Sequence, residues 1–117
     1  MTLTDQEFQI MKIVWECREA TVRDVYEEMR TRRRVAYTTV MTMMNILERK
    51  NRLSRRRDGS AFIYAPVRSR DEVVIEMVQE FVDRVFDGSI SSLLEVVNTM
   101  PRPRLKSVAS PRSRHLR

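Results

Sequence analysis

Side chains that carry out chemistry in enzymes and metalloproteins are scarce in this 117-residue sequence. One cysteine, Cys17, and one histidine, His115, cannot supply the three or four ligands of a zinc site or an intramolecular disulfide. A catalytic Cys/His or Ser/His pair would have to use His115, which lies close to the end of the sequence. Two glycines, Gly59 and Gly88, cannot build a dinucleotide-binding turn or a P-loop. We therefore expect no enzyme activity, no metal and no cofactor.

A run without glycine or proline, residues 37–50, offers hydrogen-bonding groups at helical spacing. One face of such a helix is apolar, and the opposite face is polar. Amides and hydroxyls can bond base edges, threonine methyl groups can touch thymine, and the first residues can equally hold phosphates. Asn45 is suited to adenine, whereas the alternative for Thr39 is a hydroxyl that bonds back to its own helix. The candidate DNA contacts here are Tyr37, Thr38, Thr39, Thr42, Asn45 and Arg49.

Basic residues are concentrated around this helix. From Arg30 to Arg57 the chain has ten basic residues and one acid, Glu48, which gives a local charge of +9. Neutralising phosphates supplies most non-specific affinity for nucleic acid and makes that affinity salt dependent. Arg55, Arg56 and Arg57 are the candidates for phosphate contacts. The alternative is a charged face that is simply solvated.

Two shorter helices are predicted ahead of this segment. Thr4 with Glu7, and Thr21 with Asp24, have the form of capping boxes, which mark helix starts. Apolar residues at steps of three and four then continue the first helix through about Cys17 and the second to about residue 30. We expect Cys17 to be a small buried or half-buried hydrophobe rather than a reactive thiol.

A β-hairpin is predicted after the third helix. Asn51 favours the left-handed conformation that closes a helix. Residues 53–57 and 61–64 then flank the turn Asp58-Gly59-Ser60, and Pro66 ends the second strand. Three helices followed by a basic hairpin is the order of a winged helix-turn-helix, whose third helix enters the major groove of DNA. The predicted fold is mainly α, with the hairpin as the wing and helices after it.

Two amphipathic helices are predicted after the hairpin. Ser69 with Glu72 forms another capping box, Gly88 closes the first helix, and the second runs from Ser89 to about Val97. Residues 71–95 hold seven acids against one base, so phosphate would repel them.

The apolar face of these helices is too wide for a wing to cover. We expect two copies of the chain to bury it between them as a homodimer. The alternative is that the segment folds back onto its own N-terminal domain. The predicted interface consists of Met77, Phe81, Val85, Phe86, Ile90, Leu93 and Leu94.

Composition divides the chain into a winged-helix DNA-binding domain (1–68), a helical dimerisation domain (69–98) and a disordered basic tail (99–117). The tail has three of the four prolines, six bases and no acid, so its charge equals the +6 of the whole chain. The longest charge-free stretch, 35–47, is thirteen residues, short of the roughly 20 that span a bilayer. The sequence opens without an export signal. We therefore expect a cytoplasmic protein that does not enter the membrane.

Several motifs follow one another at fixed spacing over about residues 3–94. They are Leu3-Thr4-Asp5-Gln6-Glu7-Phe8, Ile10-Met11, Val14-Trp15, Ala36-Tyr37-Thr38-Thr39-Val40-Met41-Thr42, Ile63-Tyr64-Ala65-Pro66-Val67 and Phe81-Val82-Asp83-Arg84-Val85-Phe86-Asp87-Gly88-Ser89. In order and spacing they resemble the penicillinase-repressor family of winged-helix regulators, the BlaI/MecI/CopY type.

The resemblance implies a dimeric bacterial transcriptional repressor on a palindromic operator with half-sites of the TACA/TGTA kind, controlling β-lactam resistance or a related stress response. In such relatives a membrane sensor-protease pathway triggers cleavage in the C-terminal helices, which splits the dimer and releases DNA. The Asn-Phe cleavage dipeptide would fall near Val96-Val97, where neither residue occurs, which argues against that route. No cysteine follows Cys17, so the cysteine-rich motif of copper-responsive members is absent.

Two functions from different classes fit the sequence. The first is a sequence-specific DNA-binding repressor that acts as a homodimer. The second is a protein-interaction module, in which the winged domain is a scaffold and the helices of residues 71–97 bind a different protein. Oligomeric state and DNA affinity distinguish the two.

Overall fold

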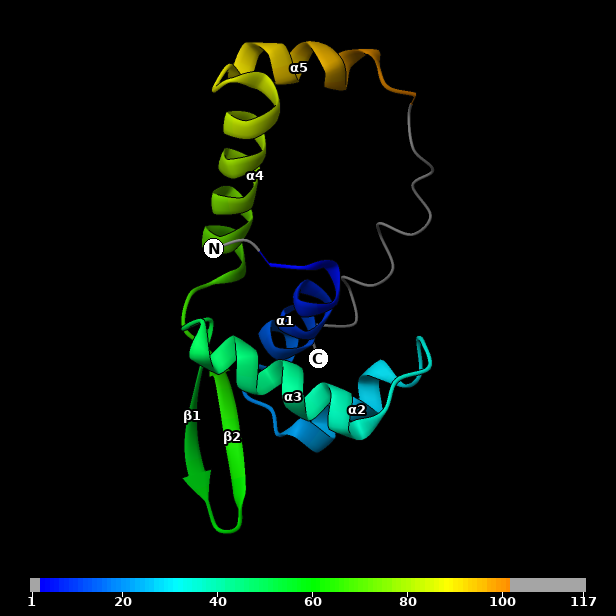
Figure 1. Cartoon of the computed structure of the whole chain (residues 1–117), viewed down its shortest axis with the longest axis vertical. Helices are drawn as coiled ribbons and strands as arrows, with labels where there is room; N and C mark the ends of the chain where they lie inside the picture. Colours follow the sequence, from blue (N-terminus) through cyan, green and yellow to red (C-terminus); the bar gives the residue numbers. More distant parts are fainter. Residues whose placement is uncertain (1–2, 102–117) are drawn as a thin grey trace. The chain divides into compact units, whose positions relative to one another are not determined.

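The computed structural model describes residues 3–101, which form five helices and one two-stranded hairpin (Figure 1). The elements in chain order are α1 (Asp5–Cys17), α2 (Val22–Met29), α3 (Tyr37–Arg49), β1 (Leu53–Asp58), β2 (Ala61–Pro66), α4 (Arg70–Phe86) and α5 (Ile90–Thr99). The chain forms two compact units, Met1–Val74 and Ile75–Arg117, with the division inside α4. The predicted domain boundary after residue 68 stays a prediction. Thr99 belongs to α5, while residues 102–117 of the predicted tail lie outside the described residues.

Three predicted capping boxes are present and start α1, α2 and α4. In α1, Thr4 Oγ1 accepts from the Glu7 N–H at 3.1 Å and the Glu7 carboxylate accepts from the Thr4 N–H at 3.0 Å. Thr21 and Asp24 repeat this exchange at 3.0 Å in both directions. Ser69 with Glu72 does so at 3.2 and 3.1 Å. Each cap satisfies helix N–H groups that would otherwise lack partners, which is worth about 1 kcal/mol.

Asn51 ends α3, as predicted, by taking the left-handed conformation at φ 64°. The Arg52 N–H bonds the Leu47 carbonyl at 2.8 Å and the Asn51 N–H bonds the Glu48 carbonyl at 3.1 Å. This pair of bonds is the Schellman motif, which satisfies the last carbonyls of a helix. The chain therefore turns directly from the end of α3 into β1.

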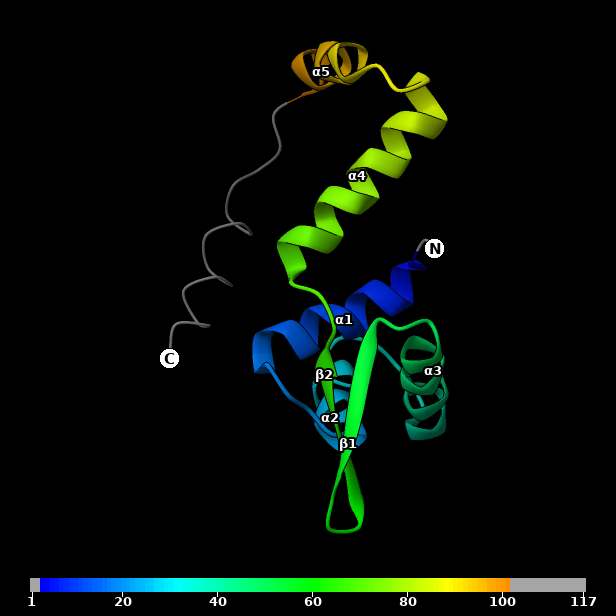
Figure 2. The same cartoon turned by 90° about the vertical axis from the view of Figure 1, so that its left-hand side faces the viewer.

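The hairpin is longer than the sequence pattern predicts and has a shorter loop. Asp58 pairs with Ala61, so Gly59 and Ser60 alone form the loop, and Gly59 takes φ 65°. The hairpin extends away from the three helices (Figures 1 and 2). Its β2 edge pairs with the segment between α1 and α2, because Ala20 and Tyr64 exchange two backbone hydrogen bonds of 2.9 and 2.8 Å.

The core of the first unit lies between α1, α2, α3 and the base of the hairpin. Every element contributes a side chain that is almost fully buried, and each buried aliphatic or aromatic group stabilises the fold by about 1.5–3 kcal/mol. Trp15 also fixes the segment after β2, because its Nε1 donates to the Arg68 carbonyl at 3.0 Å. The buried apolar residues of this unit are Leu3, Ile10, Met11, Ile13, Val14, Ala20, Val25, Met29, Val40, Met44, Leu47, Leu53, Tyr64 and Val73.

Glu7 is a buried carboxylate that joins the start of α1 to the end of α3. The Nζ of Lys50, the residue that follows α3, donates to both of its oxygens at 3.1 and 3.0 Å. Burial alone would raise the pKa of Glu7, but hydrogen bonds from Thr4 and Lys50 and the charge of Lys50 hold the pKa below its ordinary value. The sequence analysis counts Lys50 among the ten basic residues of the predicted DNA-facing surface. The structure corrects this, because Lys50 forms an ion pair with the buried Glu7.

The second unit consists of the later part of α4 and of α5. Asp87 and Gly88 both take positive φ, 52° and 86°, and the Gly88 N–H bonds the Val82 carbonyl at 3.0 Å. This confirms that Gly88 closes α4, and Figure 1 shows the chain bending sharply there. Ser89 then caps α5 by accepting from the Ser92 N–H at 3.2 Å. Within residues 3–101, no helix has the length and apolar character needed to cross a membrane.

Glu7→Gln should lower the free energy of unfolding by about 2 kcal/mol at pH 7. This is below the roughly 3–5 kcal/mol of fully buried pairs, because the Lys50 side chain is 23% exposed. Since the folded-state pKa of Glu7 is lowered from 4.5, the pair stabilises the fold above about pH 4.5 and loses this contribution as pH falls through the lowered pKa. Urea denaturation should show a smaller difference in the free energy of unfolding between variant and wild type at about pH 3 than at pH 7.

Glu27→Gln is the matched control, because Glu27 is an exposed carboxylate paired with Arg23 and Arg30. It should change the free energy of unfolding by less than about 0.5 kcal/mol at both pH values. A destabilisation by Glu7→Gln that does not depend on pH would contradict the role given to this ion pair.

Candidate nucleic-acid interface

The exposed face of α3 carries most of the predicted contact residues. Its apolar face, with Val40, Met44 and Leu47, is fully buried in the core of the first unit. The buried stripe fixes the rotation of the helix, so the polar stripe is presented to solvent. Six residues of α3 are exposed: five of the predicted contacts, Tyr37, Thr38, Thr39, Thr42 and Arg49, and the apolar Met41.

Asn45 is the exception among the predicted α3 contacts, because it is half-buried and already hydrogen bonded. Its Oδ1 accepts from the Tyr64 hydroxyl of β2 at 3.1 Å. Bidentate recognition of adenine needs both the oxygen and the nitrogen of an asparagine amide. With its oxygen held by Tyr64, Asn45 cannot make that contact as it stands.

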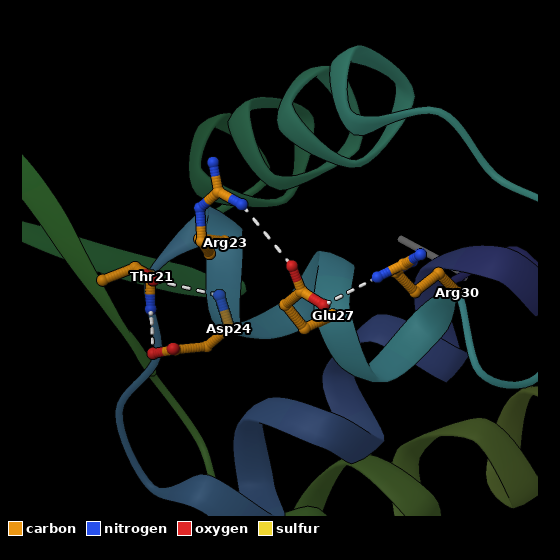
Figure 3. Close-up of polar contacts among 5 residues, drawn as sticks. All are labelled: Thr21, Arg23, Asp24, Glu27 and Arg30. Carbon is orange, nitrogen blue, oxygen red and sulfur yellow. Dashed lines mark hydrogen bonds and ion pairs between the residues drawn. The ribbon is translucent and has the colours of Figure 1, made fainter.

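The start of α3 packs against α2 through aromatic and cationic groups that the sequence pattern missed. Tyr37 meets Tyr26 edge to face at 5.4 Å between ring centroids, and the Arg23 guanidinium lies 5.6 Å from the Tyr37 centroid. Glu27 accepts from Arg23 at 3.4 Å and from Arg30 at 3.1 Å (Figure 3). The i, i+4 and i, i+3 spacing of these charges on α2 could have indicated the contacts. They place Arg23 beside the predicted contact Tyr37, while Arg30 lies 5.8 Å from the centroid of the Tyr26 ring.

The three hairpin arginines have different surroundings. Arg55 and Arg57 alternate with Arg56 along β1, so they share one face of the strand. Their guanidinium groups lie 4.3 and 5.0 Å from the Phe62 ring centroid, within the range of cation–π attraction. Arg56, on the other face, donates to the Glu19 carboxylate at 2.9 Å. Arg55 and Arg57 are therefore held as a pair, while Arg56 ties the hairpin to the α1–α2 connection.

The local charge of +9 overstates the charge that the surface offers to a phosphate. Arg32 bonds Glu28 at 3.0 Å, Lys50 is half-buried and paired with Glu7, and Arg52 is only 7% exposed. Ion pairs of exposed arginines are worth little and can be exchanged for phosphate contacts, but a buried residue cannot make such a contact. Among residues 3–101, Arg33, Arg34 and Arg49 are exposed basic residues of this block with no carboxylate within ion-pair distance.

Cys17 is exposed, so the prediction that it is buried or half-buried is wrong. It is the last residue of α1, where the chain turns away at Arg18 with φ 71°, and the apolar stripe of the helix ends before it. Partial desolvation, followed by the charges of Asp24, Glu16 and Glu28, raises the pKa of its thiol above the ordinary value. The described part of the chain contains no cluster of three potential metal-binding side chains.

The predicted dimerisation residues all retain solvent-accessible surface. Met77, Phe86 and Leu93 are half-exposed, and α5 has no buried residue at all. Phe81 and Phe86 meet edge to face at 5.8 Å. Phe81, Val85, Ile90 and Leu94 are 41–57% exposed. Other large apolar residues exposed in this unit, outside the predicted interface, are Ile75, Val78, Val96, Val97 and Met100.

The sequence matches known regulators over most of its length. A profile of the penicillinase repressor family matches residues 3–102. The transcriptional regulator BlaI of Mycobacterium tuberculosis strain H37Rv is 41% identical over 87 residues, which cover 74% of this chain and 63% of that protein. The methicillin resistance regulatory protein MecI of Mammaliicoccus sciuri is 23% identical over 92 residues, 79% of this chain and 75% of that protein. The match therefore spans less than two thirds of the length of the BlaI relative.

Two solved structures share the fold. One is the solution structure of the DNA-binding domain of the repressor BlaI, with a TM-score of 0.56 and 24% identity over 61% of this chain and 87% of that one. The other is the solution structure of Bacillus licheniformis BlaI in monomeric form in complex with the blaP half-operator. Its TM-score is 0.54 and its identity 24%, over 62% of this chain and 88% of that one. These likenesses confirm the predicted fold class, a winged helix-turn-helix.

The hairpin arginines should contribute unequally to DNA binding. Arg55→Gln and Arg57→Gln should each reduce the slope of log affinity against log salt by about 1, if each removes one of the predicted phosphate contacts. Arg56→Gln should reduce it by less than about half as much, because Arg56 lies on the opposite face of β1 and has to leave its ion pair with Glu19 to reach a phosphate. Salt titrations of duplex binding measure all three slopes, and a larger effect for Arg56→Gln than for Arg55→Gln would contradict the assignment.

Proposed function

The chain belongs to the penicillinase repressor family, and on that premise we propose that it is a sequence-specific DNA-binding transcriptional repressor. It acts as a homodimer on palindromic operators of the TACA/TGTA kind. The observation that carries the proposal is the exposed hydroxyl stripe of α3, held in the same compact unit as the arginine pair of the hairpin. The solved BlaI complex with a half-operator supports this mode of binding.

The polar face of α3 reads the major groove in this proposal. Thr38, Thr39 and Thr42 are small and exposed, so the helix can approach base edges closely, and Arg49 extends from its C-terminal end. The hydroxyl of Tyr37 lies at the start of the helix and suits the phosphate backbone. Arg55 and Arg57 of the wing neutralise further phosphates.

The second unit supplies the dimer in this proposal. Its helices expose large apolar side chains, and residues 71–95 carry seven acids against one base, a composition unsuited to phosphate. Large exposed apolar patches mark interaction surfaces, and pairing two copies would bury this one. A dimer also engages both half-sites of a palindrome, so the second contact becomes intramolecular and the affinity rises steeply.

The regulated process that we propose is β-lactam resistance or a related stress response, because relatives include regulators named for methicillin resistance and for penicillinase. Any signal that separates the two copies would release the DNA. A sensor-protease pathway is the partner that the family suggests. Val96 and Val97 replace the cleavage dipeptide and are exposed on α5, so cleavage at this position would need a protease of different specificity.

Gel-shift titration of the full chain tests the proposal. Affinity for a duplex with two inverted TACA/TGTA half-sites should fall about a thousand-fold between roughly 50 and 200 mM salt if about six phosphates are neutralised. A duplex of equal composition with scrambled half-sites is the control and should bind about a thousand-fold more weakly. Equal affinity for both duplexes would refute sequence-specific binding.

Leu94→Asp and Phe81→Asp should each convert the dimer into a monomer. An unpaired carboxylate in an apolar interface costs several kcal/mol unless it protonates. Sedimentation should show half the mass, and affinity for the palindrome should fall toward that for one half-site. Ser91→Asp, at an exposed polar position of α5, is the matched control and should keep the dimer mass. An unchanged mass for both apolar variants would refute this interface.

A further inference from the structure

The buried hydroxyl of Tyr64 determines which hydrogen-bonding group Asn45 can present. Tyr64 is 2% exposed, and a tyrosine hydroxyl at that depth needs a partner. The partner is Asn45 Oδ1, 3.1 Å away and 19 residues earlier in the sequence. Two backbone hydrogen bonds with Ala20 and the pairing with Arg55 of β1 fix the position of Tyr64 itself. In this arrangement the amide oxygen of Asn45 faces the Tyr64 hydroxyl and its nitrogen is turned away from it.

The amide nitrogen of Asn45 remains available. Within residues 3–101, Nδ2 has no acceptor, and it is not sealed from solvent, because no buried side-chain polar atom of that range lacks a partner. Asn45 lies three residues after Thr42 and four before Arg49, so the three side chains share one face of α3. Asn45 thus lies in the middle of the polar stripe of α3, and the hydrogen bond with Tyr64 does not use its amide nitrogen.

We propose that Tyr64 is a positioning residue that makes Asn45 a hydrogen-bond donor alone, and so sets base preference at one position of each half-site. This rests on the proposed function. A lone donor can bond N7 or O6 of guanine, N7 of adenine or O4 of thymine. Cytosine presents only a donor from its N4 group in the major groove, so it is disfavoured. The paired donor and acceptor that would single out adenine are absent.

The test measures affinities of the full chain for operator duplexes in which each half-site position is changed in turn to all four base pairs. The variants are Tyr64→Phe, which frees Asn45 Oδ1, and Asn45→Ala, which removes the donor. Tyr26→Phe is the matched control, because it also removes a tyrosine hydroxyl while keeping the ring that contacts Tyr37. Circular dichroism melting checks that each variant folds.

Wild-type protein should disfavour cytosine at one position by about 3- to 10-fold, the range of a single net hydrogen bond. Asn45→Ala should abolish that preference and leave the other positions unchanged. Tyr64→Phe should shift the preference at the same position toward adenine, because the freed amide can then make both bonds. Tyr26→Phe should leave all base preferences unaltered.

The outcomes separate this inference from the function on which it rests. If wild-type protein discriminates among sites but neither Asn45→Ala nor Tyr64→Phe alters any base preference, the inference is wrong and the repressor proposal stands. If wild-type protein shows no base preference anywhere, the repressor proposal itself fails. If Tyr64→Phe does not fold, the single-position loss in Asn45→Ala decides, because that change leaves the Tyr64 ring in the core.

Discussion

The Glu7–Lys50 ion pair fixes the geometry on which the candidate interface depends. The carboxylate buried at the start of α1 is stabilised because it accepts from the Thr4 backbone N–H, and because both of its oxygens accept from the Lys50 ammonium group. This holds the end of α3 against the start of α1, and the left-handed turn at Asn51 then sends the chain into β1. The ion pair and the turn at Asn51 thus act together with the buried core residues of α3 and β1 to position the hairpin beside α3.

The elements of this fold could be predicted from sequence where the signal is local. Three capping boxes, the asparagine after α3 and the glycines of the hairpin and of the α4–α5 turn each act within a few residues, and all are present as predicted. Periodicity also gave the buried and exposed faces of α3, because the alternation is a property of the helix itself.

The partners of the polar groups could not be predicted in this way. Lys50 bonds a residue 43 positions away, and Arg56 bonds one 37 positions away, so no local pattern distinguishes them from solvated charges. The Tyr64 bond to Asn45 likewise joins residues 19 positions apart and forms only in the folded chain. Cys17 was misplaced because periodicity does not show where a helix end leaves the core. Counting charges along a sequence therefore overstates the charge that a binding surface offers, because tertiary contacts already engage some of those side chains.

Because the loop of the hairpin has only two residues, the length of the paired strands sets how far the wing extends. The wing lengthens by roughly 3.3 Å for each pair of residues added, one to each strand. Inserting one residue in each strand near the base would move every arginine beyond it to the opposite face, because side chains alternate. Only insertions in even steps would keep Arg55, Arg57 and Phe62 on their present face of the hairpin, so relatives with longer wings should differ by about 6.6 Å in reach.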